Sequence, residues 1–165
     1  MKNFLSDIKT TVIGTINEDN TPFSSYAPYV YENNRFYIYI SNIATHAQNI
    51  QRNPKASLFF IEDESKSENL FARKRVSLQC DSCLISRESD QFNIILDHFE
   101  SKFDTNMVQM LKKMTDFNLF ELQVTSGEAT FGFGEAYSIG GDDMNTFVPR
   151  KSKSGGHGHG HGHSK

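Results

Sequence analysis

The sequence has no tryptophan, only two cysteines and four prolines, and no long hydrophobic run. A membrane-spanning helix needs about 20 mostly apolar residues, and the opening stretch MKNFLSDIKTT is charged and amphipathic rather than an apolar leader. We therefore expect a cytoplasmic protein with no membrane partner. Basic charge is also scarce, because 17 Lys and Arg stand against 20 Asp and Glu, which gives a net charge of −3. This balance argues against nucleic acid as a partner.

The two cysteines form a C-x-x-C motif within the strand-like stretch RVSLQCDSCLIS. A redox C-x-x-C requires a helix N-terminus that stabilises the thiolate, and a zinc site requires a second pair of ligands. Because residues three apart on a strand face opposite sides of the sheet, we interpret Cys80 and Cys83 as ordinary strand residues.

Aromatic residues are plentiful, with 14 Phe and six Tyr in 165 residues, and this length suits one domain with a continuous core. Alternating apolar and polar residues, clearest in FYIYIS, predict antiparallel strands. The predicted strands cover residues 11–17, 22–31, 36–41, 55–63, 71–86 and 119–140, the last interrupted by a turn near Ser126 and Gly127. With so many strands, a closed or nearly closed barrel is the economical way to remove exposed edges.

A short opening helix is predicted over residues 2–9, another within residues 42–54, and a pair over residues 88–103 and 106–114. In the first of the pair, Phe92, Ile95, Phe99 and Phe103 form an apolar stripe. Met107, Met110, Leu111 and Met114 are expected to fill the core in the same way. After Gly141 the chain becomes polar and glycine-rich. We therefore divide it into a folded domain, residues 1–141, and a flexible His/Gly-rich tail, residues 142–165.

The junction between a strand and a short helix, YIYISNIATHAQNIQRNP, is the first candidate site. Ser41 or Asn42 is expected to cap the helix, whose free backbone N–H groups form an anion site. Thr45 and His46 in the first turn are candidate further donors to a phosphate. A capped helix without a ligand explains the same pattern.

A cluster of three cations, Arg73, Lys74 and Arg75, is the second candidate. On a strand, Arg73 and Arg75 point to the same side and form a fork for phosphate or carboxylate, although charged residues at a strand end are usually only solvated. Gly132-Phe133-Gly134 is expected within the last strand, where glycine often marks a bulge or a close approach of a ligand.

The last residues, SGGHGHGHGHSK, place His157, His159, His161 and His163 on a glycine string. Such a segment chelates transition metals whatever the fold, and it is either native or engineered. These four histidines are the candidate metal ligands.

The stretch SNIATHAQNIQRNPKASL resembles the FMN-binding split-barrel superfamily that contains pyridoxamine phosphate oxidase. PFSSYAPYV, FARKRVSLQC and GFGEAY are similar to its HugZ/HutZ haem-utilisation branch, and the resemblance covers about residues 8–140. It implies a mainly β fold with some α structure: a split β-barrel of Greek-key antiparallel strands with a few short helices. It also implies a homodimer with sites at the subunit interface.

The resemblance further implies two kinds of ligand site. In flavin-binding relatives the phosphate is held at positions that match Ser41, Thr45, His46, Arg73 and Arg75, with Ser25 and Tyr39 on adjoining strands. In the haem branch, a histidine of the C-terminal segment ligates the iron and basic side chains pair with the propionates. That use fits one of the tail histidines as the axial ligand, and Arg73, Lys74 and Arg75 as propionate partners. The chain lacks the extra small domain of the longer members and several cations of the classic flavin enzymes, which favours haem.

The leading hypothesis from the sequence is a haem-degrading oxygenase that opens the porphyrin ring and releases iron for iron acquisition, with haem as substrate and an unidentified reductant. The alternatives are an FMN-dependent oxidoreductase and a non-enzymatic haem carrier or buffer.

Overall fold

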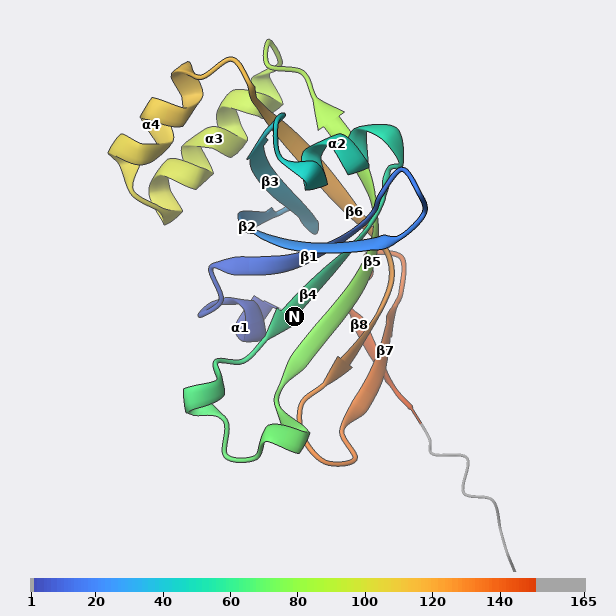
Figure 1. Cartoon of the computed structure of the whole chain (residues 1–165). Helices are drawn as coiled ribbons and strands as arrows, with labels where there is room; N and C mark the ends of the chain where they lie inside the picture. The colour runs from blue at the N-terminus through green and yellow to red at the C-terminus, as the bar shows by residue number, and fades with distance from the viewer. Residues whose placement is uncertain (1, 151–165) are drawn as a thin grey trace, which may run out of the picture.

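The structure is a computed structural model that describes residues 2–150, so His157, His159, His161 and His163 lie outside the described residues. The described part contains a single β-sheet and several short helices (Figure 1). The strands are β1 (Thr10–Ile16), β2 (Pro22–Glu32), β3 (Arg35–Ser41), β4 (Lys55–Ile61), β5 (Arg75–Ile85), β6 (Phe117–Thr130), β7 (Ala136–Gly140) and β8 (Thr146–Pro149). The α-helices are α1 (Lys2–Leu5), α2 (Thr45–Arg52), α3 (Asp90–Lys102) and α4 (Thr105–Lys113), and the 3-10 turns are η1 (Glu64–Lys66) and η2 (Leu70–Ala72).

The sheet closes into an antiparallel barrel. Its strand order is β3-β2-β1-β4-β5-β6-β7-β8, and a further pairing of β3 with β6 joins the first six strands into a ring. β4 returns beside β1 after three hairpin-connected strands, which is the Greek-key arrangement. The mainly β fold with short helices that the sequence predicts is therefore confirmed, and β7 and β8 extend the sheet beyond the ring.

Local sequence explains why the hairpins form where they do. Asn33 and Asn34 between β2 and β3 both have positive φ, 49° and 60°. Asparagine tolerates this left-handed conformation, and two such residues in succession give the turn whose twist suits a two-residue hairpin. The barrel interior is filled by aromatic and branched side chains, with Tyr29, Phe36 and Phe60 in mutual ring contact at centroid distances of 5.0–5.7 Å.

The helical pair α3 and α4 packs on the outside of the barrel, against β2 and β3, at the end that also carries α2 (Figure 1). Phe92, Ile95 and Phe99 are buried there, as the apolar stripe predicts. The prediction that the methionines of α4 fill the core is wrong: Met107, Met110 and Met114 are exposed by 52%, 51% and 40%. α4 instead turns Val108 and Leu111 toward the core, so the methionines occupy the outer side of the helix.

Two predicted boundaries also differ from the structure. β6 runs without a turn through Ser126 and Gly127, and the strands reverse at residues 131–135, where Gly134 has φ of 74°. Because β5 pairs with β6 along this stretch, the polar Ser-Gly pair is held in the sheet and only a register shift at Gln79 and Cys80 marks it. β8 lies within the segment assigned to the tail, because Phe147 and Val148 pair with β7.

Candidate functional site

Three segments that are distant in sequence meet at the end of the barrel opposite α2, which we call the lower end (Figure 1). They are the connection between β4 and β5 (residues 62–74), the turn between β6 and β7 (residues 131–135), and the end of β8. The register explains the meeting, since Arg75 pairs with Thr130 and Thr130 pairs with Ala136. The FARKR and GFGEAY motifs are therefore neighbours in space.

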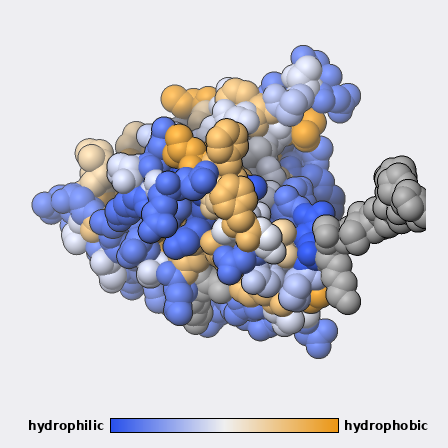
Figure 2. Space-filling model, turned by 90° about the horizontal axis from the view of Figure 1, so that it is seen from below, coloured by the Kyte–Doolittle hydropathy of each residue, from blue (hydrophilic) through white to orange (hydrophobic). Residues whose placement is uncertain are grey.

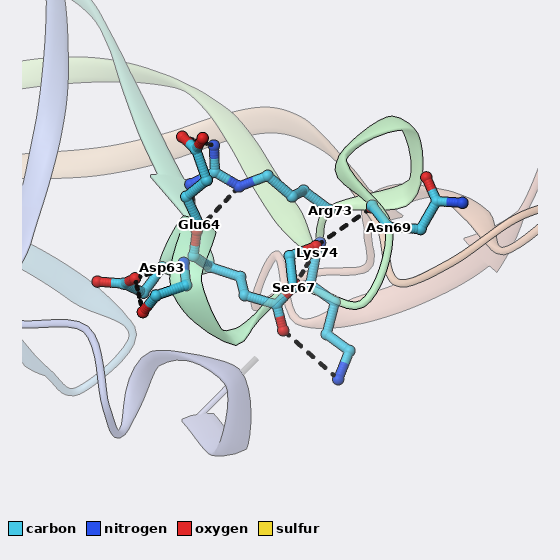
Figure 3. A network of polar contacts seen from close by, with 8 residues as sticks. Asp63, Glu64, Ser67, Asn69, Arg73 and Lys74 are labelled. Carbon is cyan, nitrogen blue, oxygen red and sulfur yellow. Dashed lines mark hydrogen bonds and ion pairs between the residues drawn. The ribbon is translucent and has the colours of Figure 1, made fainter.

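Hydrogen bonds and an ion pair join the two ends of the 62–74 connection (Figure 3). The backbone N–H of Glu62 donates to the carbonyl of Lys74 over 2.9 Å, and Nε of Arg73 donates to the carbonyl of Glu62 over 3.2 Å. The Arg73 guanidinium also lies 3.6 Å from the Glu64 carboxylate. The guanidinium of Arg73 is therefore occupied by contacts within the loop, to the carbonyl of Glu62 and the carboxylate of Glu64. The predicted fork with Arg75 is wrong, because β5 begins only at Arg75 and Arg73 lies in the turn before it.

Arg75 donates to the carbonyl of Arg73 over 2.9 Å, whereas Lys66 and Lys74 are exposed. Lys74 is 54% exposed and lies 3.8 Å from the carboxylate of Glu62. Two hollows of about 460 and 330 Å³ adjoin here, and Glu62, Lys66, Lys74 and Phe131 line both of them. Exposed ion pairs contribute little to stability, so the lysines are available for an anionic ligand.

Large apolar side chains are exposed beside these lysines. Phe71 of η2 is 90% exposed, Phe133 of the 131–135 turn is 73% exposed and Leu70 is 58% exposed. Figure 2 views the molecule from this end and shows hydrophobic patches bordered by hydrophilic side chains. Exposed aromatic groups gathered beside cations indicate a binding surface, and this combination suits a flat apolar ligand that carries anionic groups. Phe133 lies in the turn rather than within a strand, so Gly132 and Gly134 serve the reversal of the chain.

The first candidate site, at α2, lies at the other end of the barrel (Figure 1). His46 Nδ1 and Ser25 Oγ are hydrogen-bonded over 2.8 Å, which joins α2 to β2. Burial lowers the pKa of His46 below its usual value, so the imidazole is neutral at pH 7. Thr45, in the first turn of α2, is exposed.

The cap of α2 is not the predicted one. Ala44 is the N-cap and supplies no side-chain hydrogen bond. The Ser41 hydroxyl donates instead to the Asp116 carboxylate over 2.8 Å. A carboxylate that already occupies this hydroxyl repels a phosphate, so the Ser41 junction does not fit the phosphate of FMN.

Tyr39 lies under the helical pair, in a cluster separate from the residues around α2. Its ring is buried among Phe92, Phe99 and Phe117 under the helical pair, and burial raises the pKa of its hydroxyl. Its hydroxyl donates to the carbonyl of Leu111 over 3.3 Å. The structure therefore places the sequence-predicted residues in three locations: Ser25, Ser41, Thr45 and His46 around α2, Tyr39 in the outer core, and Arg73, Lys74 and Arg75 at the lower end.

Sequence reasoning missed two groups of residues. Lys66, Phe71 and Phe133 are absent from the predicted ligand contacts. The 62–74 loop has Leu70 and Phe71 beside Arg73 and Lys74, but its four acidic residues outnumber its three basic ones, so composition alone does not single it out as an anion site. Arg87 was also missed: its guanidinium donates to the carbonyls of Lys112, Met114 and Phe117 over 2.8–3.0 Å. It holds the end of α4 against β6, a role that no local pattern indicates.

Among residues 2–150, no group of three or more His, Cys, Asp or Glu side chains is placed to hold a metal ion.

The closed Greek-key barrel with outer helices defines a protein of the FMN-binding split-barrel class. The sequence profile of pyridoxamine 5'-phosphate oxidase matches residues 1–131, and the chain belongs to that family. It is 35% identical over 148 residues to "Heme oxygenase HutZ" of Vibrio cholerae, covering 90% of this chain and 84% of the relative.

Solved structures give the same result. A structure of HutZ from Vibrio cholerae, described as a heme storage protein, is 33% identical with a TM-score of 0.71, covering 74% of this chain and 86% of that one. Campylobacter jejuni ChuZ is 30% identical with a TM-score of 0.80, covering 90% of this chain and 60% of ChuZ.

Within the described residues, no helix is both long and apolar enough to span a membrane.

Proposed function

We propose that this protein binds haem and opens the porphyrin ring oxidatively, with release of iron. The observation that carries the proposal is the lower end, where Phe71 and Phe133 are exposed and where Lys66 and Lys74, together with acidic side chains such as Glu62, line two adjoining hollows. Haem has the complementary chemistry, with a flat apolar body and two carboxylates. The likeness to a relative named a heme oxygenase supports the same reading.

The residues of the lower end have distinct roles in this proposal. Phe71 and Phe133 pack against the macrocycle and keep water from its face, while Lys66 and Lys74 bind the propionates and fix its orientation. Lys74 must then exchange its contact with Glu62 for a propionate, a small cost for a half-exposed ion pair. Arg73 holds the loop in shape through the Glu62 carbonyl rather than touching the ligand. Bound haem itself supplies the chemistry of oxygen activation, with electrons from an external reductant.

The axial iron ligand in this proposal is a histidine of the C-terminal segment. The backbone N–H of Arg150 donates to the carbonyl of Ala136 over 2.8 Å, so the segment starts beside the 131–135 turn. His157 is seven residues further along the sequence, a contour length of at most about 25 Å. The tail histidines therefore have the reach to serve this end of their own chain or of a second copy.

The active form in this proposal is a homodimer. Within one chain, α2, which carries His46, lies at the opposite end of the barrel from the connection between β4 and β5 (Figure 1). A second copy is the simplest way to place the α2 end of one protomer against the lower end of the other, as the family resemblance implies. Iron acquisition in the cytoplasm is the role that such an activity would serve.

The decisive test is haem titration followed by addition of ascorbate under air. We expect stoichiometric binding with a Soret band, then loss of that band with iron captured by a ferrous chelator. A Soret band that persists would contradict the oxygenase proposal and leave haem storage, the role given to HutZ in its solved structure. Flavin absorbance in the purified protein, without haem affinity, would select the FMN-dependent oxidoreductase.

The location of the site is tested separately with matched variants. The double substitution Lys66→Met and Lys74→Met should weaken haem binding at least tenfold, because both propionate partners are lost. Lys113→Met, which removes an exposed lysine from α4, is the control and should leave binding unchanged. Equal affinity in both variants would move the site away from the lower end.

A further inference from the structure

A third hollow, of about 430 Å³, lies between α1, β2 and α3. Its walls are largely apolar, with Leu5 from α1 and Tyr29, Val30 and Tyr31 from β2, while His98 and Lys102 of α3 supply its basic groups. α1 separates it from the lower end, because Phe4 and Ile8 line the neighbouring hollow there. The haem proposal makes no use of this hollow.

Lys102 is the distinctive group in its wall. Its ammonium donates to the carbonyl of Tyr29 over 2.8 Å and sits 3.9 Å from the centroid of the Tyr29 ring. No carboxylate of residues 3–150 lies within 4.0 Å of this ammonium. Burial, together with the nearby Lys9, lowers the pKa of Lys102 to about 8. A partly buried cation without a counterion is costly, and an anion bound beside it would remove that cost.

A second lysine beside the same helix shows the contrast. Lys112 of α4 is 30% exposed and reaches two carboxylates, Glu100 at 3.1 Å and Asp97 at 3.7 Å. Both acids belong to α3, as Lys102 does, yet their carboxylates form ion pairs with Lys112. The charge of Lys112 is therefore neutralised within the fold, whereas that of Lys102 is left for something outside it.

The other polar groups of the hollow are already engaged. The Ser6 hydroxyl donates to the carbonyl of Asn3 over 3.0 Å, and the Ser101 hydroxyl donates to the carbonyl of Asp97 over 2.9 Å. His98 Nδ1 lies 3.6 Å from the Glu32 carboxylate. An ammonium has three donors, and the Tyr29 carbonyl and ring take two of them. The Lys102 ammonium thus retains a donor for a single anionic group, with the His98 ring in the same wall.

We propose that this hollow is a second ligand site, which binds an apolar monocarboxylate with its carboxylate on Lys102 and its body against the β2 side chains. Its volume falls within the range of small-molecule pockets, about 300–1,000 Å³, which combine apolar walls with a few polar groups. One uncompensated cation selects one negative charge. The apolar walls select an aromatic or alkyl body.

Calorimetric titration of the full chain with 1-naphthoate and with octanoate tests the proposal and distinguishes the two kinds of body. We expect at least one of them to bind in a saturable manner, with 1-octanol binding at least tenfold more weakly than octanoate. Lys102→Met should weaken binding of the carboxylate at least tenfold, and Lys102→Arg should restore most of it. Lys113→Met is the matched control and should bind like the unaltered chain.

A spectroscopic measurement separates ligand binding from a structural effect. The ε-methylene signals of Lys102, followed by NMR through a pH titration, should report a higher pKa when the carboxylate is bound, because the anion stabilises the ammonium. The proposal is overturned if neither carboxylate saturates at millimolar concentration, if Lys102→Met binds as well as the unaltered chain, or if haem displaces the ligand at a one-to-one ratio. Haem titration of Lys102→Met should be unaffected, which keeps a failure here distinct from a failure of the haem proposal.

Discussion

The backbone N–H of Arg150 donates to the carbonyl of Ala136, one residue beyond the 131–135 turn that carries Phe133. This hydrogen bond follows the pairing of Tyr137 with Pro149 and continues the β7–β8 ladder to the lower end. The point where the described chain ends is therefore fixed relative to the aromatic groups and lysines of the proposed haem surface. A histidine ligand that follows in sequence starts from a defined place.

This placement predicts how the tail histidines contribute. Because the glycines make all four nearly equivalent in reach, single substitutions of His157, His159, His161 or His163 by Ala should change haem affinity by less than about threefold. Replacing all four, or truncating the chain after Arg150, should abolish the absorption spectrum of histidine-ligated haem. An unchanged spectrum after truncation would assign the iron ligand to the described residues. The fold itself should survive truncation, as circular dichroism would verify.

The two cysteines should react very differently with a thiol reagent. Cys83 is exposed, while Cys80 is buried and its thiol pKa is raised to about 12 by burial and by the neighbouring Asp81. The thiolate is the reactive form, so we expect one fast equivalent at pH 8 and a second only after unfolding. Mass spectrometry of the labelled peptides checks the assignment. Cys83→Ser should remove the fast phase, and rapid labelling of Cys80 in the native protein would contradict the packing of β5.

The aromatic interior of the barrel should dominate stability. Phe60 is fully buried, and its ring centroid lies 5.0 Å from that of Tyr29 and 5.2 Å from that of Phe36. Phe60→Ala leaves a cavity in the ring of packed side chains, so it should lower the free energy of unfolding by about 3–5 kcal/mol. Urea denaturation measures the change. Phe71→Ala is the control, because its side chain is 90% exposed and should alter stability by less than about 0.5 kcal/mol.

His46 should make stability fall on mild acidification. Burial lowers its pKa in the folded state, so the unfolded chain takes up a proton first as the pH drops below the ordinary value of 6.5. This contribution is fully present above about 6.5 and is lost as the pH falls toward the folded-state pKa. The urea midpoint should therefore decrease between pH 7.5 and 5.5, and His46→Asn should flatten that decrease. A pH dependence identical in the variant would show that other groups cause it.

The sequence predicts the barrel well and the sites less well, for physical reasons. The period-two pattern of Phe36, Ile38 and Ile40 identifies the face that packs inside the barrel. It does not reveal that the alternate residues Tyr37 and Tyr39 are buried as well, because the helical pair that covers them is set by the fold. The prediction that the α4 methionines are buried is wrong because α4 has apolar residues on more than one side, and its sequence does not reveal which side packs against the barrel. The turn at residues 126–127 was predicted from composition alone, and pairing with β5 overrides that local preference.

The candidate site shows a further limit. FARKR and GFGEAY were identified separately, but their contact depends on the register between β5, β6 and β7, which is a property of the whole sheet. Arg73 illustrates the same point, because its role in the loop depends on Glu62, eleven residues away on the other side of the connection. Charge in a motif is visible in a sequence, whereas the partner that neutralises it is set by the fold.

The dense pairing of β6 fixes the base of the 131–135 turn at the lower end. This strand is hydrogen-bonded to β5 from Leu119 to Thr130, to β3 at its start and to β7 at its end, so most of its length has neighbours on both sides. Segments with such dense pairing open last in native proteins, while loops open first. Phe133 is therefore carried by a turn at the tip of a densely paired strand. The turn can adjust to a ligand face while the position of its base stays constant.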